Sequence, residues 1–143
     1  MNQTDDKDKT TQKVIIFGVF LIAVFVCIQM LLKKPLIDEN MAKAASEVNK
    51  ICPFMVDSIT RLDNSAALPN NVFLVNYTLL NADKSIFDTT ELINTIKPIT
   101  LNGLKTNPKY KLFRDIHTNI SFVYHDKNGS YLCTLQINSD EYK

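Results

Sequence analysis

The chain lacks most of the residues from which common catalytic and metal-binding motifs are built. Its 143 residues include only three glycines, and it contains no G-x-S-x-G, P-loop or G-x-G-x-x-G motif. This excludes the usual signatures of serine hydrolases and of phosphate-binding or dinucleotide-binding loops. Neither of the two histidines, His117 and His125, has a cysteine or carboxylate at metal-ligand spacing. We therefore predict that the protein is not an enzyme, has no catalytic residue or metal site, and requires no cofactor.

Cysteine is scarce and odd in number. Cys27, Cys52 and Cys133 are the only three, and no two of them form a C-x-x-C pair. Small extracytoplasmic domains usually carry paired cysteines. Free thiols in a reducing cytosol are the simpler account, so we expect the N-terminus outside and the following domain in the cytoplasm.

Charge is absent from the nineteen residues 14–32, VIIFGVFLIAVFVCIQMLL. At about 1.5 Å per residue such a helix spans a hydrocarbon core of about 30 Å. The sequence thus predicts a single-pass protein of the bacterial inner membrane, in contact with the lipid bilayer. We expect a disordered tail at 1–13, a transmembrane helix at 14–34 and a soluble α+β domain at 35–143.

The first half of the soluble domain reads as a helix followed by a β-hairpin. Apolar residues recur at alternating spacings of four and three after Asp38, which indicates one buried helix face, and Pro53 should bend or end that helix. The segments TRLDNSAAL and VFLVNYTLL flank a Pro-Asn-Asn turn and alternate as strands do.

The second half repeats this order. Asp88, with Glu91 three residues on, resembles a capping box that opens a second helix with an apolar stripe, and Pro98 should break it. ISFVYH and SYLCTLQI form a second hairpin, whose turn has Gly129 at a position that needs positive φ. We therefore predict an α+β fold, a transmembrane helix followed by helix, hairpin, helix and hairpin, with a mostly antiparallel four-stranded sheet and helices on one face.

The net charge of the soluble domain does not favour binding to DNA or RNA. Residues 35–143 carry 11 Lys and Arg against 12 acids, so we predict no DNA or RNA partner. A domain of this size buries a modest core, which favours a homo-oligomer.

Positively charged residues are concentrated in the segment 105–117. Together with the preceding leucine, its sequence reads LKTNPKYKLFRDIH. The candidate ligand-binding residues are Lys105, Lys109, Tyr110, Lys111 and Arg114. Lysines and a planar guanidinium suit phosphate, and an aromatic ring suits a base. The alternative is a solvated helix face whose aromatics turn to the core.

The segments NKICPFMVDSITRLD, LPNNVFLVNYTL, KTNPKYKLFRD and FVYHDKNGSYL resemble small bacterial single-pass proteins. The layout is similar to that of the small membrane effectors of type III CRISPR systems. That resemblance implies an antiviral homotetramer whose cytoplasmic domains bind a cyclic oligoadenylate, cyclic tetra-adenylate, and whose transmembrane helices then perturb the membrane. It assigns no ligand contact to any position of this chain.

A second hypothesis is a membrane-tethered binding or assembly subunit of the periplasm that has no small-molecule ligand. Orientation of the domain separates the two, because a periplasmic domain cannot meet a nucleotide made in the cytosol.

Overall fold

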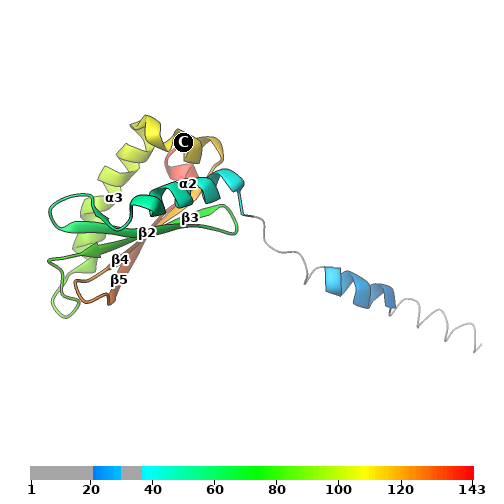
Figure 1. Cartoon of the computed structure of the whole chain (residues 1–143), viewed down its shortest axis with the longest axis horizontal. Helices are drawn as coiled ribbons and strands as arrows, with labels where there is room; N and C mark the ends of the chain where they lie inside the picture. The colour runs from blue at the N-terminus through cyan, green and yellow to red at the C-terminus, as the bar shows by residue number, and fades with distance from the viewer. Residues whose placement is uncertain (1–20, 30–36) are drawn as a thin grey trace, which may run out of the picture. The chain divides into compact units, whose positions relative to one another are not determined.

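The computed structural model describes residues 21–29 and 37–143 (Figure 1). The chain divides into two units, residues 1–35 and residues 36–143, and each is considered by itself. Every residue of the hydrophobic core lies in the second unit. That unit therefore has the buried apolar surface it needs to fold independently.

The described part of the first unit is a short helical segment, residues 21–29, whose side chains are all exposed. Nine residues of α-helix extend about 14 Å, roughly half of a hydrocarbon core. In the part of the chain that the structure describes, no helix combines the length and apolarity that crossing a membrane requires. The predicted transmembrane helix 14–34 is thus not found there, and its remaining residues lie outside the described ones.

The second unit opens with helix α2, Glu39–Ile51. The helix begins near Asp38 as predicted, and Asp38 caps it, because its carboxylate accepts hydrogen bonds from the backbone N–H groups of Asn40 and Met41. Met41 and Ala45 are buried on the predicted face. The helix ends before Pro53, which lacks the N–H that another turn would use.

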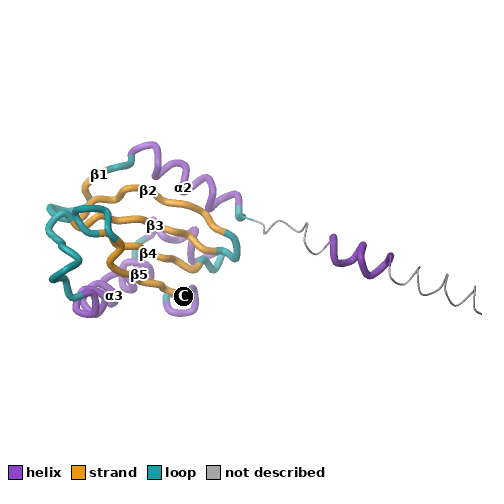
Figure 2. Tube along the Cα trace, turned by 90° about the horizontal axis from the view of Figure 1, so that it is seen from below, coloured by secondary structure: helices purple, strands orange, loops and turns teal. Residues whose placement is uncertain are grey.

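The sheet has five strands in the order β1-β2-β3-β4-β5 (Figure 2). Their bounds are Phe54–Met55 for β1, Thr60–Leu68 for β2, Val72–Leu79 for β3, Asn119–His125 for β4 and Tyr131–Ile137 for β5.

The predicted four-stranded, mostly antiparallel sheet is wrong in two respects. It lacked the edge strand β1, and the central pair β3 and β4 is parallel, with Phe73 opposite Ile120 and Val75 opposite Phe122. Both predicted hairpins do form, β2 with β3 and β4 with β5. The sheet is mixed because the helical region between the hairpins carries the chain back to the end from which β3 began, so β4 runs alongside β3.

That crossover contains helix α3, Thr89–Thr106, the 3-10 turn η1, Pro108–Tyr110, and the short helix α4, Lys111–Asp115. Pro98 does not break α3 as predicted. It is exposed, as is Asn94 one turn earlier, so water can reach the carbonyl that loses its hydrogen bond. The predicted break at Asn107-Pro108 is present.

The fold has two layers, with α2 and α3 over the same face of the sheet (Figures 1 and 2). Alternate residues of β3 and β4 are buried on that face. Strand β2 has a register shift after Leu62. Because of it, Leu62 and Ser65 both pair with residues of β3 that face the helices, although they lie three positions apart instead of two. One sheet face is therefore core, and the other carries mostly half-buried and exposed side chains, with Thr78 buried among them.

Helix α2 lies along the outer edge of β2 and occupies its backbone groups. The Asn49 amide donates to the Ser65 carbonyl at 2.8 Å, and the Asn49 carbonyl accepts from the Ser65 N–H at 2.7 Å. Strand β1 is only two residues long, so much of the β2 edge needs another partner. Asn49 is that partner at Ser65. Because it occupies the backbone groups there, a strand of another molecule cannot pair with this part of the edge.

The chain closes against its own core after the short turn η2, Ser139–Glu141. Tyr142 is completely buried, and its hydroxyl donates to the carbonyl of Thr118. This bond ties the C-terminus to the segment that leads into β4.

Candidate functional site

A groove runs along α3 in the second unit, and we call it the α3 groove; a separate, more open hollow of about 570 Å³ lies between α2 and β2. The α3 groove comprises adjoining hollows of about 390, 270 and 410 Å³. The first two share Tyr77, Tyr124 and Ile99, and the first and third share Phe87 and Leu92. The remaining lining residues are Val56, Asp57, Ile59, Thr60, Leu79, Asn81, Ile86, Asp88, Glu91, Thr95, Ile96, Thr100, Gly103, Leu104, Asn107, Tyr110 and Phe122.

The floor of the groove is aromatic. Tyr77 of β3 and Tyr124 of β4 are register partners, with ring centroids 5.4 Å apart, and Phe122 lies 6.2 Å from Tyr77. Burial raises the pKa of Tyr77 to about 12 and raises the pKa of Tyr124 further, so both phenols stay protonated at neutral pH.

Both phenol groups are available to a partner. Neither the Tyr77 nor the Tyr124 hydroxyl bonds to another group in the parts of the chain that are described. Because no fully buried side-chain polar atom among the described residues lacks a hydrogen-bond partner, each of these two oxygens keeps some exposure to solvent. The floor thus combines apolar rings with two hydrogen-bonding groups.

The wall of the groove is the apolar stripe of α3. Leu92, Ile96 and Ile99 follow one another at spacings of four and three residues, which places them on one helix face. The sequence predicted this stripe. Its end remains open, because Ile99 is 69% exposed, and a large apolar side chain so exposed beside a groove indicates a surface for another molecule.

The mouth of the groove is built from the β1–β2 and β3–α3 loops. The carboxylate of Asp57 accepts from the backbone N–H groups of Ile59 and Thr60, and Leu80 N–H donates to the Ile59 carbonyl at 2.8 Å. These bonds hold Ile59 at the mouth although its side chain is exposed. Ile86, on the second loop, is 87% exposed.

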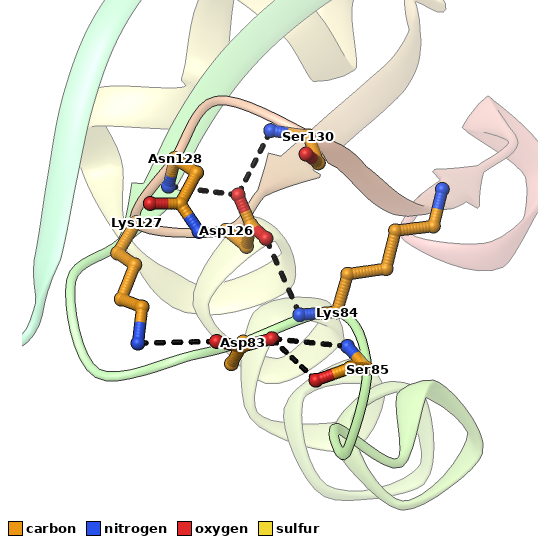
Figure 3. Close-up of polar contacts among 7 residues, drawn as sticks. All are labelled: Asp83, Lys84, Ser85, Asp126, Lys127, Asn128 and Ser130. Carbon is orange, nitrogen blue, oxygen red and sulfur yellow. Dashed lines mark hydrogen bonds and ion pairs between the residues drawn. The ribbon is translucent and has the colours of Figure 1, made fainter.

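A latch of polar contacts holds the β3–α3 loop to the β4–β5 turn (Figure 3). The carboxylate of Asp126, 2% exposed, accepts from the N–H groups of Asn128 and Ser130, each at 2.8 Å, and of Lys84 at 3.2 Å. The Lys127 ammonium pairs with Asp83 at 3.1 Å. Two loops distant in sequence are thereby joined directly before Ile86 and Phe87.

Both carboxylates of the latch favour the ionised state. Burial by itself raises the pKa of Asp126, but the N–H groups of Ser130, Asn128 and Lys84 outweigh it and lower the pKa overall. The hydroxyl and N–H of Ser85, followed by Lys127, lower the pKa of Asp83 to about 2. The latch is therefore fully charged at neutral pH.

Of the five residues predicted to bind a ligand, only Tyr110 lines the groove. Arg114 donates to the carbonyls of Leu104 and Asn107, so its guanidinium caps the C-terminal end of α3. Lys111 pairs with Asp115 within α4 at 2.5 Å.

Lys105 and Lys109 are exposed on the last turn of α3 and on η1. Neither lines the groove. The structure therefore does not gather the predicted cations around one concavity.

Sequence reasoning missed the groove itself. The alternation of β3 and β4 assigned Tyr77 and Tyr124 to the core, and nothing local distinguishes a core ring from one that floors a groove. One available signal was the apolar character of Val56, Ile59 and Ile86, which lie in loops where polar residues are more usual.

These observations define the class of protein: a two-layer α+β domain with a five-stranded mixed sheet and an apolar groove between one helix and the sheet. The chain belongs to the family described as Domain of unknown function (DUF8479), whose family model matches residues 36–133. No curated protein matches the sequence.

Solved structures share the fold. A candidate secreted protein from Pseudomonas aeruginosa is similar with a TM-score of 0.61 and 8% identity, over 73% of this chain and 91% of that one. The pilotin EpsS of the Vibrio vulnificus type 2 secretion system gives 0.57 and 9%, over 73% and 89%. The type II secretion system pilotin AspS from Vibrio cholerae gives 0.54 and 8%, over 71% and 88%. At such identities the likeness concerns the fold.

This fold overturns the resemblance to a CRISPR membrane effector, since the structures that share it are secretion-system pilotins and a candidate secreted protein. The predictions drawn from that resemblance are corrected with it: the antiviral role, the cyclic tetra-adenylate ligand and the homotetramer. The inner-membrane, single-pass placement with a cytoplasmic domain is corrected too, since the structures that share the fold are secretion-system pilotins and a candidate secreted protein.

Proposed function

We propose that this chain is a membrane-tethered assembly or binding subunit that holds an apolar segment of a partner protein in the α3 groove. It has no small-molecule ligand and no catalytic activity. The observation that carries the proposal is the groove, with its aromatic floor, its apolar helix wall and the exposed side chains of Ile86 and Ile99 at its rim. Grooves of this kind suit apolar protein segments.

The shared fold supports this proposal. Two of the similar structures are pilotins of type 2 secretion systems. The tether that the sequence offers is the apolar run 14–32. Of that run the described residues 21–29 form a helix with exposed apolar side chains, which a lipid or protein environment would cover.

Photo-crosslinking in the native cell tests the proposal with the full chain. A photoreactive amino acid at Ile99 samples the groove, and one at Gln136, exposed on β5, samples a matched control surface. We expect position 99 alone to yield a discrete adduct with one membrane or envelope protein. Ile59→Asp should abolish it, because a carboxylate would be placed at the apolar mouth. Adducts that form equally at both positions, or that survive Ile59→Asp, would contradict the proposal.

A further inference from the structure

We propose that the partner segment in the α3 groove carries Lys or Arg beside its apolar side chains. This inference rests on the proposed function and adds the charge of the partner. It comes from the residues at the groove's rim.

The rim carries charge of one sign. Asp57, Asp88 and Glu91 line the groove, and no Lys, Arg or His is among the described residues that line its three hollows. The rest of the domain is nearly balanced in charge, so this one-sided rim is a local feature.

Two lysines of the elements that border the groove are engaged elsewhere. Lys127 pairs with Asp83 in the latch, and Lys97 of α3 pairs with Glu141 at 2.8 Å. Neither Lys127 nor Lys97 lines the groove. Lys84 of the β3–α3 loop is exposed and its ammonium has no partner in the described chain, but it does not line the groove either. The lining itself therefore leaves the rim carboxylates for a cation that the partner brings.

The three carboxylates differ in what they do for the fold. Asp57 holds the turn that leads into β2, and its bond from the Ile59 N–H is the main reason that its pKa is lowered, which keeps it ionised. Asp88 caps α3 by accepting from the N–H groups of Thr90 and Glu91. The Glu91 side chain has no hydrogen-bond or ion-pair partner in the described chain, so its charge is free to meet a ligand.

Apolar floor and anionic rim together select the occupant. An apolar segment with acidic flanks would bring like charges together at the rim, whereas Lys or Arg can lay its aliphatic stem on the apolar wall and its charged end near Glu91. The free hydroxyls of Tyr77 and Tyr124 can also bond to backbone groups of the segment. The geometry thus favours a cationic amphipathic segment over a neutral or acidic one.

The test uses residues 36–143, since the whole core lies in that unit, after thermal unfolding shows a cooperative transition. Two labelled model peptides of about 18 residues have leucine at the same positions and lysine or glutamate at all others. Fluorescence anisotropy measures their binding at low salt. We expect the lysine peptide to bind at least tenfold more tightly than the glutamate peptide, and about 0.5 M salt to narrow this difference.

Variants locate the effect. Glu91→Gln should weaken binding of the lysine peptide about 2–5-fold, as expected for one exposed ion pair, and Glu91→Lys should weaken it further. Glu47→Lys is the matched control, because it reverses one exposed acid on α2, outside the groove lining, and it should leave binding unchanged.

The outcomes separate the two proposals. If the glutamate peptide binds as tightly as the lysine peptide, or if Glu47→Lys weakens binding as much as Glu91→Lys, the charge inference is wrong while the groove remains a docking site. If neither peptide binds to a folded domain, the proposed function fails as well.

Discussion

The contact between Asn49 and the edge of β2 offers a sharp test of how this fold is held. In an antiparallel strand the N–H and C=O of one residue point to the same side. Because both groups of Ser65 bond to the Asn49 amide, neither pairs with β3. Asn49→Ala removes both partners at once and leaves two polar groups at a residue that is 4% exposed.

The magnitude follows from those contacts. Two neutral hydrogen bonds at about 0.5–1.5 kcal/mol each give a loss of about 1–3 kcal/mol in the free energy of unfolding. Since Asn49 itself is exposed, water can enter where its amide was, which brings the expected value to about 2 kcal/mol. Asn49→Asp should lose less, because a carboxylate oxygen can still accept from the Ser65 N–H.

Urea unfolding of residues 36–143, followed by circular dichroism, measures the loss. With a slope of about 1–3 kcal/mol/M, a loss of about 2 kcal/mol lowers the midpoint by about 0.7–2 M. The control is Asn64→Ala, on the same strand as Ser65. It removes the exposed hydrogen bond that the Asn76 amide of β3 donates to the Asn64 side chain and should cost less than about 0.5 kcal/mol. Equal midpoints for the two alanine variants would refute the argument that Asn49 satisfies the strand edge.

Three further results are expected. Tyr142→Phe keeps the buried ring but deprives the Thr118 carbonyl of its donor, so the free energy of unfolding should fall by about 1 kcal/mol in the same urea assay; an unchanged midpoint would contradict this. Asp83 has a pKa of about 2 in the folded domain, below its unfolded value of about 3.9. Its contribution to stability is therefore complete above about pH 4 and is lost as the pH falls toward 2. Asp83→Asn should flatten the melting temperature between pH 2 and 4, and an unaltered acid limb would argue against the latch. Finally, burial raises the pKa of both the Cys52 and the Cys133 thiol, but Cys52 is only partly buried, whereas Cys133 is buried. A thiol reagent at pH 8 should therefore modify Cys52 before Cys133, which should react only as the domain unfolds; equal rates would contradict the burial.

Several local elements were determined by the sequence alone. Asp38 and Asp88 begin helices because their carboxylates bond to N–H groups two and three residues on. Gly129 turns the second hairpin at φ 81°, and Asn70 and Asn71 turn the first with positive φ. Each of these features depends on residues within a few positions of one another, so a pattern in the chain is enough to predict it.

Arg114 and Pro98 show where local patterns are insufficient. The cations of 105–117 suggested an anion site, but the guanidinium of Arg114 bonds to carbonyls at the end of α3. Pro98 suggested a helix break, but exposure of the surrounding turn lets α3 continue. In both cases the outcome depends on the surroundings of the side chain, and tertiary packing determines those surroundings.

Only the tertiary structure decided the sheet order and the groove. The parallel pairing of β3 with β4 joins residues more than forty positions apart, such as Val75 and Phe122. The course of α3 across the sheet sets that pairing, and no local preference in either strand does. The same course of α3 leaves Tyr77 and Tyr124 as the floor of a groove where alternation alone predicts core. Hydrophobic periodicity specifies which face of an element is buried, whereas the completeness of that burial depends on where the next layer of the fold ends.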